Sequence, residues 1–292
     1  ATPSATDHTD FGSVQLGQNQ TRVYSIKNNG TTTLTINSIS ITGTNASDFT
    51  YTSSSLPANI TAGNTLTLNV TFTPAALGSR TATVEIGSTD CDESTFDFAI
   101  QGTGACATPT AYNVTGGGAY CAGGAGMPVG LSNSQTGINY QLTLGATPVG
   151  SPVTGTGTAI TFGNQSTGGN YTVVATNTVG NCTNNMTGNA TVTVNPLPTA
   201  FTITGGGAYC SGGSGVNISL SGSQTGVSYQ LMLGASASGS PVNGTGSSIS
   251  FGNRTAAGTY TVVATNTSTN CVNNMTGSAT VVINPLPPVN NM

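Results

Sequence analysis

The chain has 292 residues, of which 41 are glycine and only 4% are charged: four Lys or Arg and eight Asp or Glu. An ordinary globular protein carries about 25% charged residues. Four scattered cations cannot form the basic patch that phosphate binding needs, so nucleic acid is excluded as a partner. No stretch of about 18 apolar residues occurs, so we expect no membrane insertion.

Residues 1–105 hold most of the charge and predict a β-sandwich. Eleven of the twelve charged side chains lie before residue 100, and the remaining one is Arg254. Apolar and polar residues alternate over 66–72 and 96–100, which is typical of strands with one buried face. Further strands are expected around Tyr24 and Ile26, over 34–41 and over 82–86, with turns at 28–30 and 62–64.

A domain boundary is expected in the Gly- and Pro-containing stretch 102–109, and an internal repeat follows it. The segment 112–121 recurs at 201–210 and Asn-Pro-Leu-Pro at 195–198 recurs at 284–287, both 89 positions later. A period of 89 residues is too long for a solenoid unit of about 20 to 50 residues. The sequence therefore predicts domains at 1–105, 106–198 and 199–292.

Each repeat carries the signals of a small all-β domain. In the first copy, short alternating segments are expected at 112–114, 129–131, 140–144, 160–162, 171–175 and 192–194. Six or seven short strands with frequent turns are typical of the immunoglobulin-like sandwich. The sequence thus predicts an all-β chain of three tandem immunoglobulin-like β-sandwiches, with extended Asn-Pro-Leu-Pro spacers.

Several motifs add a family resemblance. Thr9–Val14, Ile26–Gly30, Ala46–Phe49, Val70–Pro74 and Phe98–Gly104 resemble the abnormal-spindle/Hydin family of immunoglobulin-like domains, in the branch found in secreted bacterial surface proteins. Gly-Gly-Gly-Ala-Tyr-Cys, 171–177 and Asn-Pro-Leu-Pro resemble Thr/Gly-rich repeats of bacterial adhesins. The resemblance implies a fold and a cell-surface location but no catalytic motif. In the first family a strand usually precedes a segment like 1–4, so the first sandwich is expected to lack an edge strand.

Six cysteines predict disulfides and an extracellular location. Cys121 and Cys182 are 61 residues apart, as are Cys210 and Cys271, and Cys91 and Cys106 bracket the last predicted strand of the first domain. We expect disulfides within each repeat, with free or intermolecular cysteines as the alternative. Zinc is disfavoured because no Cys-x-x-Cys occurs and His8 is remote from every cysteine.

The residues offer little chemistry, so we expect no enzyme and no cofactor. Residues 107–292 contain no Asp, Glu, His or Lys that could act as a general acid or base. His8 lacks an accompanying nucleophile motif. The glycine triplets 116–118 and 205–207 lack the context of a phosphate-binding loop, so turns or bulges are expected there. Four carboxylates form a weak calcium candidate, against the alternative of a solvated turn: Asp90, Asp92, Glu93 and Asp97.

A surface with so little charge needs another source of solubility, or a partner that covers it. Asn-x-Ser/Thr triplets at equivalent repeat positions make Asn164, Asn185, Asn253 and Asn274 the glycosylation candidates. Low charge also removes the repulsion that would oppose packing of subunits into a fibre. The expected partners are therefore covalent glycans and copies of the chain itself.

The sequence as a whole favours a non-catalytic structural protein of the bacterial cell surface, either a stalk or the repeating subunit of an extracellular filament. Subunits could join by strand addition, with 1–10 or 288–292 as the donor. The alternative is an adhesin-like module that binds carbohydrate or a host surface, for which Tyr120 and Tyr209 are stacking candidates beside a competing structural role.

Overall fold

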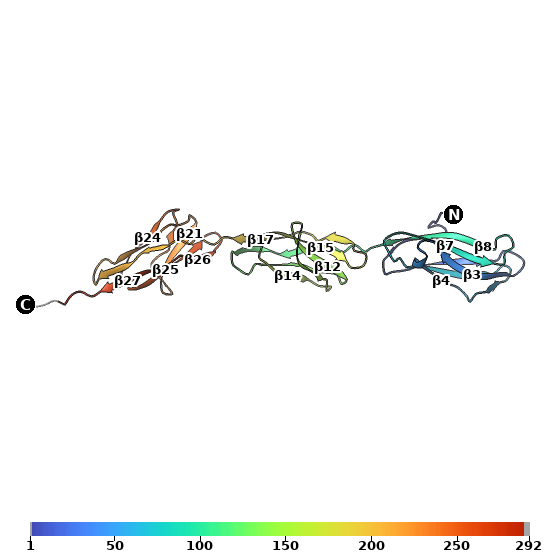
Figure 1. Ribbon diagram of the computed structural model, residues 1–292, viewed down its shortest axis with the longest axis horizontal. Coiled ribbons are helices and arrows are strands. Elements are labelled where there is room, and N and C mark those ends of the chain that lie inside the picture. The colour runs from blue at the N-terminus through green and yellow to red at the C-terminus, as the bar shows by residue number, and fades with distance from the viewer. Residues whose placement is uncertain (1, 289–292) are drawn as a thin grey trace, which may run out of the picture. The chain divides into compact units, whose positions relative to one another are not determined.

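The computed structural model of the chain describes residues 2–288. Contacts group the chain into two compact units. The first reaches to Thr115 and includes 130–162 and 171–189; the second comprises 116–129, 163–170 and the chain from Ala190 onward. Within the described residues the structure is all-β, with one three-residue 3-10 helix, η1 (Ala46–Asp48), beside the strands (Figure 1). The predicted fold class, tandem immunoglobulin-like β-sandwiches, is confirmed.

The first domain is built from two facing sheets. Its strands are β1 (Asp10–Gln15), β2 (Gln20–Lys27), β3 (Leu34–Thr42), β4 (Phe49–Thr52), β5 (Ala58–Ile60), β6 (Thr65–Phe72), β7 (Gly78–Ser88) and β8 (Thr95–Ala105). One sheet has the order β1-β8-β7-β3-β5 and the other β2-β6-β4. The β1–β8 pair is parallel, whereas β7–β8 and β2–β6 are antiparallel.

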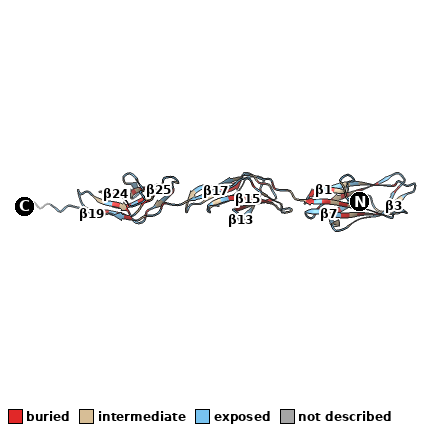
Figure 2. Cartoon of the chain, turned by 90° about the horizontal axis from the view of Figure 1, so that it is seen from above, coloured by how far each residue is buried: buried red, intermediate tan, exposed pale blue. Residues whose placement is uncertain are grey.

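The alternation in the sequence decides which side chains fill the core of this domain. Along β6, Leu66, Leu68, Val70 and Phe72 are buried and the residues between them face outward. Phe72 stacks on Phe49 at a ring-centroid distance of 4.8 Å, and Phe11 approaches Phe49 edge-on at 5.6 Å. Figure 2 shows buried residues along the strands of the chain, interspersed with exposed ones.

The second repeat also consists of two sheets. Its strands are β18 (Ile203–Gly205), β19 (Gly207–Cys210), β20 (Val216–Leu220), β21 (Val227–Leu233), β22 (Ser236–Ala237), β23 (Val242–Asn243), β24 (Ile249–Arg254), β25 (Gly258–Asn266), β26 (Val272–Asn274) and β27 (Ala279–Asn284). The larger sheet has the order β19-β27-β25-β21-β22, and the smaller β18-β20-β24. Tyr229 and Tyr260 are fully buried at its centre.

The first repeat has equivalent strands. They are β9 (Val114–Gly116), β10 (Gly118–Cys121), β11 (Met127–Leu131), β12 (Ile138–Leu144), β13 (Thr147–Thr154), β14 (Ile160–Gln165), β15 (Gly169–Asn177), β16 (Thr183–Asn185) and β17 (Ala190–Asn195). Their sheets have the orders β10-β17-β15-β12-β13 and β14-β11-β9. The buried Tyr140 and Tyr171 match the tyrosines of the second repeat.

Each glycine triplet marks the point where a strand crosses from one sheet to the other. β9 belongs to the small sheet and β10 to the large one, with Gly117 between them. Gly116, Gly117 and Gly118 all have positive φ, at 92°, 80° and 130°. A Cβ on Gly117 would lie 2.5 Å from the carbonyl oxygen of Thr191. The expected turn or bulge is therefore a crossing that only glycine can make.

Candidate functional site

The first feature of interest is a set of cysteines beside the end of each domain. β10 runs parallel to β17, and Cys121 pairs in register with Asn195, the residue that precedes Pro196. In the same way Cys210 pairs with Asn284 at the end of β27. Cys106 directly follows β8, the last strand of the first domain. We call Cys106, Cys121 and Cys210 the exit cysteines, because each lies beside the segment that leaves its domain.

The remaining cysteines lie in the loops that follow β7, β15 and β25, and we call Cys91, Cys182 and Cys271 the loop cysteines. In the repeats the short strands that directly follow these cysteines, β16 and β26, contact the segment that enters the domain. The Asn184 amide donates to the carbonyl of Pro109 at 2.8 Å, and the Asn273 amide donates to that of Pro198 at 2.7 Å. The loop cysteine of a repeat therefore lies beside the incoming linker.

The disulfides join an exit cysteine to the next loop cysteine. Cys106 bonds to Cys182, with a Cα separation of 6.0 Å, and Cys121 bonds to Cys271, with a Cα separation of 5.5 Å. Cys91 and Cys210 are free and exposed.

This pairing corrects the expectation of disulfides within each repeat, because neither Cys121–Cys182 nor Cys210–Cys271 forms. Cys121 lies beside the outgoing linker of its repeat, whereas Cys182 lies beside the incoming one. Cys91 and Cys106, which bracket β8, are not bonded to each other, because the 11 residues of that strand separate them. At about 3.3 Å per residue, β8 holds these two thiols about 35 Å apart.

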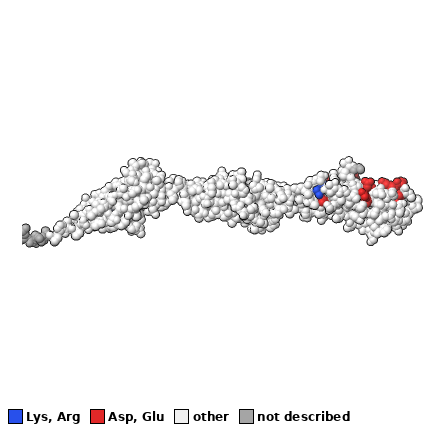
Figure 3. Space-filling model, viewed as in Figure 1, with Lys and Arg blue, Asp and Glu red and all other residues white. Residues whose placement is uncertain are grey.

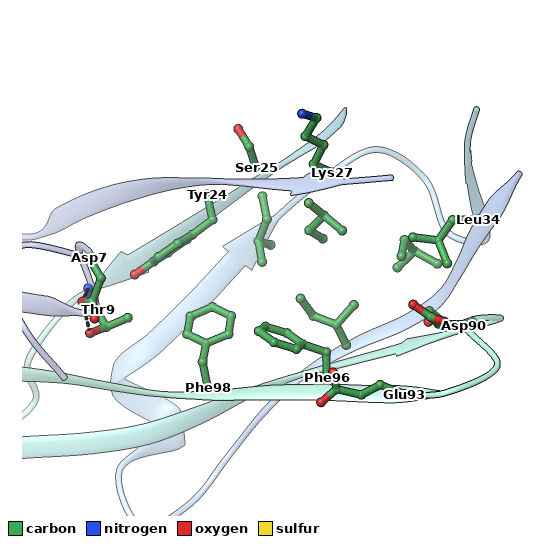
Figure 4. A pocket seen from close by; sticks show the side chains of 15 residues that line it. Asp7, Thr9, Tyr24, Ser25, Lys27, Leu34, Asp90, Glu93, Phe96 and Phe98 are labelled. Carbon is green, nitrogen blue, oxygen red and sulfur yellow. Dashed lines mark hydrogen bonds between the residues drawn. The ribbon is translucent and has the colours of Figure 1, made fainter. Parts of the chain in front are cut away.

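The second feature is an apolar groove on the first domain. It has a volume of about 470 Å³ and lies between β2 and the first half of β8, with Tyr24, Phe96 and Phe98 pointing into it (Figure 4). Tyr24 and Phe98 approach at a ring-centroid distance of 5.2 Å, and Phe96 remains 48% exposed. β1 pairs with β8 only from Gln101 onward. Among the described residues, the edge of β8 before this point therefore has no neighbouring strand on the β1 side.

Polar groups close the two ends of the groove. Asp90 and Glu93 lie at one end, and Asp7 and Thr9 at the other (Figure 4). Hydrogen bonds from Thr9 lower the pKa of Asp7 to about 2. Burial raises the pKa of Tyr24 to about 12, and its hydroxyl donates to the carbonyl of His8 at 2.8 Å. At neutral pH the groove thus has an apolar floor and anionic ends.

The predicted N-terminal donor is folded onto its own domain. The Asp10 amide donates to the carbonyl of Ser4 at 2.9 Å, and the Ser4 amide donates to the Thr9 hydroxyl at 2.8 Å. This closed turn, followed by β1, is not available as an extended donor in this structure. Of the other predicted donor, 288–292, all but Pro288 lies outside the described residues.

The remaining predicted sites are exposed or engaged in structural contacts. Asp97 is on β8, opposite Glu85 of β7. Asp90, Asp92 and Glu93 lie in the loop between these two strands. Nowhere in residues 2–288 do three or more His, Cys, Asp or Glu side chains gather as metal ligands would. The four glycosylation candidates, Asn164, Asn185, Asn253 and Asn274, are all exposed.

The two tyrosines proposed for sugar stacking make structural contacts. The Tyr120 hydroxyl donates to the carbonyl of Ser166, and the Tyr209 hydroxyl donates to that of Thr255, both at 2.5 Å. Eleven of the twelve charged residues belong to the first domain, whose acidic groups are visible on the face shown in Figure 3. No helix within the described part of the chain has the length and apolar character of a membrane span.

Comparison with known proteins gives a family match for the first domain alone. The family model of Cep192 domain 4 matches residues 4–106. No curated protein matches the chain. Among solved structures, a PapD-like domain (domain 7) of human CEP192 is 16% identical, over 34% of this chain and 80% of that one, with a TM-score of 0.27.

Two multidomain structures match more of the chain. The three-domain ectodomain of mouse nectin-like molecule 4 is 12% identical over 97% of this chain and 99% of that one, with a TM-score of 0.27. The fibronectin(III)-like modules of Clostridium thermocellum CbhA are 12% identical over 61% of this chain and 99% of that one, with a TM-score of 0.32. At these identities and scores, nothing about activity or partners is transferred. The family match shows that residues 4–106 are similar to Cep192 domain 4.

Proposed function

We propose that the protein is a non-catalytic structural protein of the bacterial cell surface, a stalk or the repeating subunit of an extracellular filament. The observation that carries this proposal is a pair of disulfides. Cys121–Cys271 joins the two repeats, and Cys106–Cys182 ties the residue that directly follows β8 to a loop of the first repeat. A bond across a linker restricts the motion of one domain against the next, which a load-bearing array requires. Disulfides also persist in oxidising compartments, which supports an extracellular location.

The surface chemistry supports the same proposal. The sequence from residue 107 onward contains no Asp, Glu, His or Lys, so the repeats lack groups for acid/base catalysis. Exposed Asn-x-Ser/Thr triplets such as Asn185 and Asn274 offer glycan attachment in place of charge. The groove beside β8 offers an edge to which an extended segment of another copy could add.

Electron microscopy of the material from its natural source tests this proposal. We expect filaments or stalks whose repeating density has the volume of three small sandwiches, with extra density at exposed Asn side chains. Enzymatic deglycosylation should lower the mass of the chain. Dispersed single chains with the mass of the bare polypeptide would contradict the proposal.

A second function, an adhesin-like module for carbohydrate, is favoured by the groove alone. Phe96 is a half-exposed aromatic side chain beside the carboxylates of Asp90 and Glu93, and sugars are bound by such combinations. A glycan array with the full chain and with Phe96→Ala decides between the functions. Binding that Phe96→Ala abolishes would favour the adhesin; absence of binding would leave the structural role.

A further inference from the structure

The two free cysteines occupy positions that are cross-linked elsewhere in the same chain. Cys210 is the counterpart of Cys121, 89 positions earlier in the repeat, and Cys121 is bonded to Cys271. Both follow a glycine triplet and end a strand that runs parallel to the last strand of the domain. Cys210 is therefore an exit cysteine that bonds to no loop cysteine in this structure.

Cys91 is the complementary half. It lies between β7 and β8. In its sheet β7 lies between β8 and β3, just as β15 lies between β17 and β12 and β25 lies between β27 and β21. Its loop is closed by a bond from the Ser88 amide to the carbonyl of Ser94 at 2.8 Å. The loops of the repeats are closed in the same way, from Asn177 to Cys182 at 2.8 Å and from Asn266 to Cys271 at 2.9 Å. Cys91 is thus a loop cysteine that bonds to no exit cysteine in this structure.

The disulfide-bonded cysteines and the free cysteines differ in solvent exposure. Cys271 is 0% exposed beside its partner Cys121, whereas Cys91 and Cys210 are both exposed. Each exit cysteine before Cys210 is bonded to a loop cysteine, and each loop cysteine after Cys91 is bonded to an exit cysteine. One chain therefore presents one free exit cysteine, Cys210, and one free loop cysteine, Cys91.

We propose that Cys210 of one copy forms a disulfide with Cys91 of a second copy, so that copies join head to tail by the bond that already joins domains within a chain. The proposal deepens the proposed function, on which it rests, by naming the covalent contact between subunits. After two copies are linked, one copy still has a free Cys91 and the other a free Cys210, so further copies can be added at both ends.

The linkage is a two-electron oxidation. The two thiols lose two protons and two electrons as the S–S bond forms, and a small-molecule disulfide such as glutathione disulfide accepts them and becomes two thiols. The reaction passes through a mixed disulfide, which the thiolate of the second cysteine attacks.

Charge favours this pairing over the symmetric one between two loops. Cys91 is flanked by Asp90, Asp92 and Glu93, so two copies of the loop repel each other. Cys210 lies in a repeat whose single charged residue is Arg254, so no such repulsion opposes its approach to the loop.

The test uses the full chain with its two native disulfides, incubated in a mixture of glutathione and glutathione disulfide and run on a non-reducing gel. We expect a ladder of linked copies for the unaltered chain. Cys91→Ser and Cys210→Ser should each remain monomeric alone. A mixture of the two variants should give a dimer and nothing larger, with a Cys210–Cys91 peptide at least tenfold more abundant than either symmetric pair.

A statistical mixture of symmetric and mixed dimers would overturn the proposal, because it would indicate random oxidation of exposed thiols. Absence of any cross-link would overturn it as well. Filaments in native material that lack this bond would overturn the linkage but leave the proposed function standing. A specific bond in solution, with no filaments in native material, would support the linkage and remove the proposed function.

Discussion

At the scale of single residues, the stability of the first domain depends on a buried carboxylate and its ion pair. Asp48 is 1% exposed and is held by the Nε of Arg80 at 2.5 Å. Removing the partner of a buried charge costs about 3–5 kcal/mol, because the charge stays buried without compensation. We expect Arg80→Met to destabilise this domain by that amount.

Denaturant unfolding of the full chain, followed by hydrogen exchange in peptides of residues 9–105, measures this loss. Lys27→Met is the matched control, because Lys27 is exposed and the charge change is the same. Equal unfolding midpoints for the two variants would contradict the role given to the ion pair.

A second residue-scale prediction concerns pH. The pKa of Tyr24 is raised to about 12 by burial, above the value near 10 of an unfolded chain. The folded state therefore holds its proton where the unfolded state releases it, so this contribution to stability is complete below pH 10 and is lost as the pH rises to about 12. Tyr24→Phe should flatten the fall in stability over this window, whereas the control Tyr51→Phe should leave it unchanged; the same fall in both variants would refute the assignment.

At the scale of elements, the sheet crossing at the glycine triplet sets where the exit cysteine lies. Alanine at Gly117 combines a φ of 80° with a Cβ 2.5 Å from the Thr191 carbonyl oxygen, so we expect a loss of more than about 2 kcal/mol. Gly123 has a φ of 85° and open space around it, so Gly123→Ala should lose only about 1 kcal/mol. Thermal unfolding of both variants measures the difference, and equal losses would show that the crossing tolerates a side chain.

The sequence predicts long alternating strands better than short ones. β6 and residues 96–100 of β8 follow from alternation of large apolar residues, and the structure confirms both as strand. β4 and β5 span only four and three residues, too few for a period to emerge. The crossing between β9 and β10 was expected only as a turn or bulge, because a glycine triplet indicates positive φ but not which sheet each side joins.

At the scale of the whole molecule, the cysteine pattern shows the limit of sequence reasoning. Equal spacings within the two repeats suggest bonds inside each repeat, but spacing does not reveal which end of a domain a residue occupies. That information comes from the parallel pairing of β10 with β17 and from the contacts of β16 and β26 with the linkers. Because each exit cysteine bonds to the next loop cysteine, Cys91 and Cys210 stay free, and the number of cysteines alone does not predict this.

The disulfide between the two repeats should hold the chain together after the linker between them is cut. A protease site inserted between Pro198 and Thr199 should allow the chain to be cut while its two parts stay joined through Cys121–Cys271. The fragments should separate on a gel only after reduction. Cys271→Ser with the same inserted site is the control and should separate without reduction; separation of both chains alike would argue against a bond across the linker.

Disulfide mapping tests the central claim, that cysteines join successive domains, most directly. The oxidised full chain is digested with its thiols blocked, and the linked peptides are identified by mass spectrometry. The account predicts peptides that join Cys106 to Cys182 and Cys121 to Cys271, with Cys91 and Cys210 either blocked as free thiols or joined to each other between copies. Peptides that join Cys121 to Cys182 and Cys210 to Cys271 would contradict it.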